Sequence, residues 1–166
     1  MKKKILIGVA IVIAIIAITL GFLVNKANNM KSEFTGFREE LDKDFFPLLK
    51  DTHTHFETVI QKGQSHELEN WYLLDEGGMT SNLKYSREVD KIRDRIVNTD
   101  VKQKDTIELK KNVLNSLSTM DSALKSINTL YKSDSSDVLW TTLGLDIDKL
   151  KKNVDDQNKI LGRYYK

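Results

Sequence analysis

Residues 143–164 read LGLDIDKLKKNVDDQNKILGRY, and their spacing is the clearest structural signal in the chain. Because residues three and four apart share one face of an α-helix, this spacing predicts an amphipathic helix with a narrow, coiled-coil-like seam. The seam residues alternate at intervals of four and three, and most residues between them are charged or Asn: Leu143, Ile147, Leu150, Val154, Gln157, Leu161 and Tyr164.

Three further segments carry a similar pattern and predict three more helices. One seam runs through Val113, Leu117, Met120, Leu124, Ile127 and Tyr131, and another through Tyr85, Val89, Ile92 and Ile96. The first segment is rich in aromatic residues, and its stripe consists of Met30, Phe34, Phe37, Leu41, Phe45, Leu48, Thr52, Phe56 and Val59. The expected fold is therefore all-α, an antiparallel bundle of three to four long helices. A three-helix bundle on a long stalk is the alternative.

The breakers in these segments predict where helices bend, end or begin. Pro47 lies inside the aromatic stripe, where it is expected to kink or restart the helix, with Asp44 capping the restarted part. A short helix is predicted before Gly77-Gly78 and is expected to end there. The helix that follows is expected to be capped by Thr80 or Ser81.

The apolar run ILIGVAIVIAIIAITLGFLV from Ile5 to Val24 holds 20 residues without a charge and predicts a transmembrane signal-anchor. Lys2, Lys3 and Lys4 precede it, so the N-terminus is expected inside and the C-terminal domain outside the cell membrane. This divides the chain into a cytoplasmic N-terminus (1–4), the anchor (5–24) and an extracytoplasmic bundle (25–166). A cleaved signal peptide is the alternative. Small residues at Ala10, Ala14, Ala17 and Gly21 share one helix face, which would pack another transmembrane helix or meet lipid.

Composition narrows the class of function. After the three N-terminal lysines, 23 basic and 24 acidic residues remain, a balance without the excess of positive charge that nucleic-acid binding requires. The chain has no cysteine, so neither disulfides nor thiolate metal sites are expected.

Candidate sites are few. His53 and His55 are two residues apart and would point to different sides of a helix, and His66 lies in a separate segment, so no metal site is predicted. We find no pattern for a catalytic nucleophile, a cofactor or a phosphate loop, and we expect no enzyme. Trp71, Tyr72 and Trp140 are possible partner contacts, because such side chains anchor many interfaces, although the core of a bundle also needs them.

The run Asp44-Phe45-Phe46-Pro47-Leu48-Leu49-Lys50-Asp51-Thr52 resembles the D-L-I-P-N-L-V-E-T run of the LemA family, whose members are singly anchored helical proteins. The resemblance covers about nine positions and lacks the Asn after proline and the paired arginines before the motif. It is compatible with an anchored helical bundle, and no function is carried across from it.

These observations favour a membrane-anchored, non-enzymatic interaction protein that docks or modulates another membrane or envelope component, as in immunity or phage superinfection exclusion. A ligand-binding bundle that reports to a separate membrane protein is the first alternative. A self-associating structural envelope protein is the second.

We predict that the full-length chain stays in the membrane pellet after alkaline extraction. Alkaline phosphatase fused after Lys166 should be active, because the fusion would place it outside the cytoplasm and this enzyme folds only there. Deletion of residues 5–24 should release the protein into the soluble fraction and leave the fusion inactive. A soluble full-length chain would contradict the predicted anchor.

Overall fold

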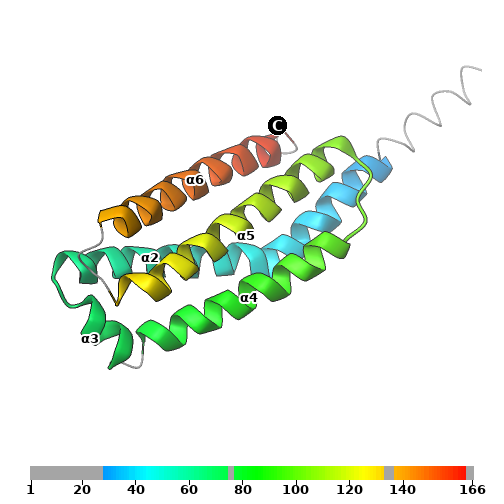
Figure 1. Ribbon diagram of the computed structural model, residues 1–166. Coiled ribbons are helices and arrows are strands. Elements are labelled where there is room, and N and C mark those ends of the chain that lie inside the picture. The colour runs from blue at the N-terminus through cyan, green and yellow to red at the C-terminus, as the bar shows by residue number, and fades with distance from the viewer. Residues whose placement is uncertain (1–27, 75–76, 133–136, 164–166) are drawn as a thin grey trace, which may run out of the picture.

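The computed structural model describes residues 28–74, 77–132 and 137–163, and within these residues the regular structure is entirely helical (Figure 1). Residues 28–40 are helical and continue into the π-helix η1 (Leu41–Phe45) and then α2 (Phe46–Gln64). The short α3 (Leu68–Leu73) follows, and three long helices complete the fold: α4 (Gly78–Asn98), α5 (Lys104–Leu130) and α6 (Asp137–Gly162).

The four long helical rods alternate in direction, as Figure 1 shows. The first rod runs from residue 28 toward α3, α4 returns, α5 runs outward again, and α6 returns beside it. The predicted all-α antiparallel bundle is therefore confirmed, and the first rod is a full member of it. The end of the bundle that carries α3 lies opposite residue 28, and we call it the far end.

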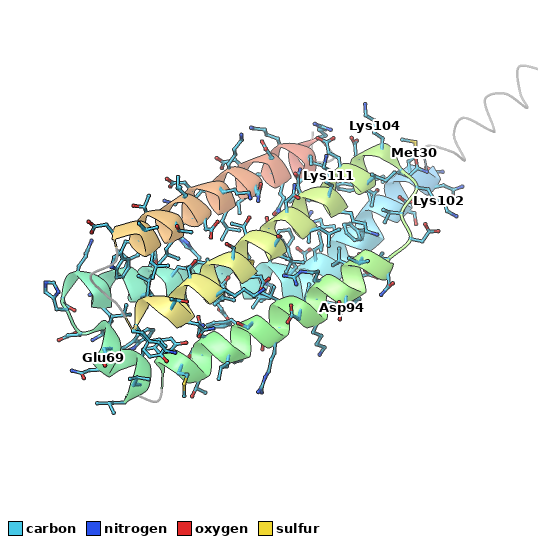
Figure 2. The ribbon with its side chains drawn as sticks, viewed as in Figure 1. Met30, Glu69, Asp94, Lys102, Lys104 and Lys111 are labelled. Carbon is cyan, nitrogen blue, oxygen red and sulfur yellow. The ribbon has the colours of Figure 1, made fainter. Side chains whose placement is uncertain are left out.

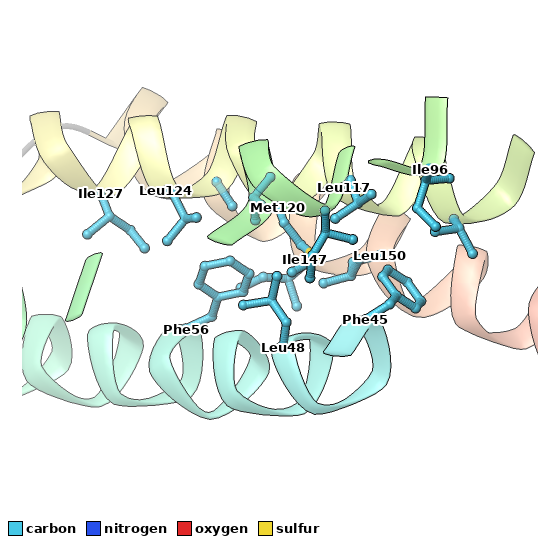
Figure 3. Packing of buried hydrophobic residues seen from close by; sticks show 14 of the residues in the cluster. Phe45, Leu48, Phe56, Ile96, Leu117, Met120, Leu124, Ile127, Ile147 and Leu150 are labelled. Atoms are coloured by element: carbon cyan, nitrogen blue, oxygen red, sulfur yellow. The ribbon is translucent and has the colours of Figure 1, made fainter. Parts of the chain in front are cut away.

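The predicted seams form the core. Thr52 and most of the apolar residues of the aromatic stripe are buried, as are Val89 and Ile96 of α4 and the α5 seam from Val113 to Ile127. Figure 3 shows Phe45, Leu48 and Phe56 facing the side chains of α5, with Ile147 and Leu150 of α6 close by. Each long helix thus buries most of the face that its periodicity predicts. The end of the α6 seam was predicted wrongly, because Ile160 is buried there while Leu161 is half-buried, and Tyr164 lies outside the described residues.

The first helix passes through Pro47 without interruption. Helical backbone extends from residue 28 to residue 64, and the turn just before the proline widens into the π-helix η1, where the N–H of Phe46 donates to the carbonyl of Leu41. Proline lacks an N–H, and its ring crowds the carbonyl four residues back. A wider turn at this place relieves the crowding while Phe45 and Leu48 stay in the core.

The predicted cap at Asp44 was wrong. Asp44 lies within η1, and α2 has no side-chain cap. Its carboxylate instead accepts two hydrogen bonds from the guanidinium of Arg95 on α4, one of them 2.6 Å from Nη2 to Oδ1. The carboxylate therefore joins the first rod to α4.

The predicted start of α4 was also wrong, because Thr80 and Ser81 lie inside the helix and Gly78 is its first residue. A Cβ atom on Gly78 would lie 2.5 Å from Cα of Tyr72 and 2.8 Å from the carbonyl oxygen of Trp71. The start of α4 therefore rests directly on the backbone of α3, a contact that only glycine allows.

The opposite end of the bundle is held by Glu33. Its Oε1 accepts hydrogen bonds from the backbone N–H groups of Lys102 (3.0 Å) and Gln103 (2.9 Å), just before α5 begins. The first rod is thereby tied to the connection between α4 and α5.

Within residues 28–74, 77–132 and 137–163, no helix combines the length and the apolar character needed to cross a bilayer. The predicted anchor at residues 5–24, with Ala10, Ala14, Ala17 and Gly21, lies outside the described residues and stays a prediction.

We predict opposite effects for two Gly→Ala substitutions. Gly78→Ala should lower the free energy of unfolding by about 1–3 kcal/mol, because the new methyl group meets backbone atoms that cannot move alone. Gly144→Ala is the matched control: its Cβ would meet nothing within 4 Å. It should raise stability by about 0.5–1 kcal/mol, since alanine favours a helix interior. Urea unfolding followed by circular dichroism measures both, and equal effects would contradict the contact between α3 and α4.

Candidate functional site

A cluster of four polar side chains lies inside the far half of the bundle, and each comes from a different helix. His55 (α2), Tyr72 (α3) and Asn82 (α4) are buried, and Asn128 (α5) is half-buried. We call these four residues the polar cluster. It is the place where the four helices α2 to α5 are joined by side-chain hydrogen bonds.

Asn82 is the centre of the polar cluster. Its Nδ2 donates to the carbonyl oxygen of Leu124 (3.0 Å) and to Oδ1 of Asn128 (2.9 Å). The hydroxyl of Tyr72 also donates to Oδ1 of Asn128. With Nδ2 directed at two acceptors, Oδ1 of Asn82 must accept from Nε2 of His55, 3.1 Å away. His55 therefore carries a proton on Nε2, and a second proton would have to add at Nδ1.

Aromatic rings surround the polar cluster. The His55 ring lies 5.3 Å from the ring of Tyr85 and 5.7 Å from that of Trp71, measured between centroids. Tyr72 stacks on Tyr131 with centroids 4.4 Å apart. This setting lowers the pKa of His55, because burial disfavours the charged imidazolium more than the hydrogen bond to Asn82 favours it. Burial also raises the pKa of the Tyr72 hydroxyl.

The polar cluster has a structural role: its hydrogen bonds hold four helices together. Its hydrogen bonds are made among its own members and to the helix backbone. Those of the Tyr72 hydroxyl, to Asn128 and from Asn82, fix the short α3 against α5 and α4. Satisfied polar groups of this kind in a core add specificity of packing, because any other arrangement leaves a buried donor unpaired. We infer that the polar cluster sets the position of the far end.

Four apolar side chains are exposed at that far end, where α3 stops and α4 starts. The exposed fractions are 45% for Leu73, 78% for Leu74, 43% for Met79 and 44% for Leu83. Met79 and Leu83 are one turn apart on α4, and the contact of Gly78 with Tyr72 brings Met79 next to the end of α3. We call Leu73, Leu74, Met79 and Leu83 the tip patch. Figure 2 shows Glu69 of α3 at this end and Met30 at the opposite one.

The three aromatic residues predicted as possible partner contacts occupy different settings. Tyr72 is buried in the polar cluster and Trp71 is half-buried against His55, so both serve the core in this structure. Trp140 lies elsewhere, at the start of α6, where its ring packs on Gly63 of α2 so closely that a Cβ there would be 2.1 Å from it.

The three histidines lie in different surroundings. The side chain of His55 is buried beneath α3 and α4. His53 is partly exposed and lies 3.4 Å from the carboxylate of Glu57. His66 is exposed in the connection between α2 and α3. In the described part of the chain, no three metal-binding side chains come close enough to hold an ion.

The seam patterns did not predict Asn82 and Asn128 as members of a buried polar cluster. Asn82 continues the α4 seam by one step, three residues before Tyr85, so a polar residue on a seam was the available signal. Asn128 stands beside Ile127 at the edge of the α5 seam and gave no comparable signal.

Comparison of the chain with models of protein families, with curated proteins and with solved structures found no match. The short resemblance to the LemA family is thus not accompanied by a match to a family model.

We predict that the stability of this protein falls on acidification partly through His55. Above its ordinary pKa of 6.5 the side chain is neutral in the folded and the unfolded state. As the pH falls below 6.5, the unfolded chain binds a proton that folded His55 resists, so the free energy of unfolding decreases down to the lowered folded pKa.

The measurement is the midpoint of thermal unfolding between pH 7 and pH 5. His55→Gln keeps a side-chain N–H for Asn82 without the titration, and its midpoint should fall less than that of the wild type. His53→Gln is the matched control at the partly exposed histidine and should follow the wild type. Identical slopes for all three proteins would show that His55 makes no contribution.

Proposed function

We propose that this chain is a membrane-anchored, non-enzymatic interaction protein whose bundle stands outside the membrane and docks another membrane or envelope protein. The observation that carries this proposal is the tip patch, four exposed apolar side chains at the end of the bundle farthest from residue 28. Exposed apolar side chains that gather at one end of a helical domain are typical of interaction sites, because burying them under a partner gains free energy.

The support beneath the tip patch strengthens the proposal. Leu73 and Leu74 directly follow Tyr72, which is held by its hydrogen bond to Asn128 and its stacking on Tyr131. Met79 directly follows Gly78, which rests on the α3 backbone. A patch on such a rigid support loses little conformational entropy on binding, so modest apolar contact can yield useful affinity.

The predicted anchor at residues 5–24 fits the same role. It would confine the protein to the membrane surface and raise its effective concentration toward partners in the same membrane. Block or modulation of an envelope machine, as in immunity or superinfection exclusion, is a function of this kind.

We predict that a photo-reactive group on the tip patch captures a specific partner in intact cells. Since the chain has no cysteine, Leu74→Cys gives a single attachment site for a benzophenone reagent on the full-length protein. A discrete heterologous adduct should form, and Leu73→Ser with Leu83→Ser should reduce its yield about tenfold, because apolar anchors supply most of the energy of such interfaces.

Lys91→Cys, an exposed position farther along α4, is the control and should not give this adduct. The same adduct at both positions, or no adduct at Leu74, would contradict docking through the tip. A ladder of the protein with itself would instead assign the tip patch to self-association.

A further inference from the structure

A second feature is an open groove between α2 and α6, on the flank of the bundle. It encloses about 250 Å³ and is lined by Phe46, Leu49, Lys50, His53, Ile147, Leu150, Lys151 and Val154. The lining residues of α2 cover eight positions, 46–53, and those of α6 also cover eight, 147–154, so the groove is about two helical turns, or about 10 Å, long.

The groove exists because α6 is attached mainly to α5. Gln157 donates to Oγ of Ser116 at 2.9 Å, and Ser122 donates to Asp146 at 2.7 Å. Toward α2, the first turn of α6 is held by Trp140 on Gly63. Farther along α6, apolar side chains of both helices face a space that the bundle itself does not fill.

The chemistry of the groove is apolar inside and basic at the edges. Phe46, Leu49 and Val154 contribute half-buried apolar surface, and Lys50 on α2 and Lys151 on α6 stand on opposite lips. The ammonium of Lys151 lies 4.0 Å from Asp148, and both side chains are mostly exposed, so this ion pair holds the lysine weakly. An occupant with an apolar stripe and acidic residues beside it would complement the groove.

Location and size decide between kinds of occupant. Phe46 follows residue 28 by eighteen positions, or about 27 Å of helix. With the anchor proposed above at residues 5–24, the groove would stand too far from the bilayer for a lipid that stays in it. The volume lies below the roughly 300–1,000 Å³ of pockets that enclose whole small molecules. The groove runs along the bundle axis, as α2 and α6 do, so a helix rising from the same membrane would lie along it.

We propose that this groove receives an amphipathic α-helix of the membrane partner, with apolar residues at i, i+4 and i+7 on the groove floor and acidic residues beside Lys50 and Lys151. Such a helix presents its apolar anchors over two turns, which is the length of the groove. This inference deepens the proposed function and rests on it for the identity of the partner. It assigns a second contact surface, separate from the tip patch.

The test uses the full-length protein in phosphatidylcholine nanodiscs. The probe is a fluorescein-labelled helical peptide of about 18 residues, or five turns, with leucine at the anchor positions and glutamate on both flanks. Fluorescence anisotropy should show saturable binding that weakens with added salt. Lys50→Glu with Lys151→Glu should weaken binding about tenfold or more, and a lysine-flanked peptide should then prefer this variant over the wild type.

Lys84→Glu with Lys91→Glu is the matched control. It makes the same change in charge at exposed positions of α4, away from the groove, and should leave binding unchanged.

Equal binding of the acidic peptide to the groove variant, or no binding to the wild type, would overturn the inference. So would disulfide dimers of full-length His53→Cys but not Lys91→Cys, because the occupant would then be a second copy. A tip adduct in cells without peptide binding would leave the proposed function standing and remove the groove alone.

Discussion

The whole bundle depends on keeping one aromatic stripe straight across a proline. Phe34, Phe45 and Phe56 are buried at intervals along a single rod, and every other long helix contributes to the core that covers this rod. A break at Pro47 would turn half of the stripe away from the core. The π-helical turn before Pro47 accommodates the proline ring locally, so the stripe continues and the remaining helices have one continuous surface to pack on.

The polar cluster adds what apolar seams alone do not supply. Apolar seams tolerate sliding and exchange of neighbours, whereas a buried amide such as Asn82 is satisfied in one arrangement only. The hydrogen-bond partners of Asn82 come from α2, α3 and α5. These bonds therefore determine which helices are neighbours and how they are positioned relative to one another along the bundle axis. The short α3 benefits most, because a helix of six residues has little stability without such contacts.

The two candidate contact surfaces follow from this arrangement. The far end is built by α3 and the first turn of α4, which leaves leucine and methionine side chains exposed above a fixed support. The flank stays open since α6 is secured to α5 by buried and surface polar contacts, including Arg163 with Asp105 and Glu108. Both surfaces lie on the solvent side of elements whose inner faces are committed to the core. Binding at either one therefore requires no unfolding of the bundle.

The sequence by itself determined the helices and their buried faces, because periodicity at three and four residues is a local property that each segment carries alone. The seams of α4, α5 and α6 and the aromatic stripe were predictable for this reason, as was the antiparallel order implied by short connections. Only the tertiary structure decided the roles of His55, Asp44 and Gly78. Each depends on a neighbour distant in the chain or on a backbone contact across a turn: Asn82 for the histidine, Arg95 for the aspartate and the end of α3 for the glycine. The open groove between α2 and α6 also could not be predicted from the sequence. It forms because α6 packs mainly on α5 and only partly on α2, and no single segment of the sequence encodes that arrangement.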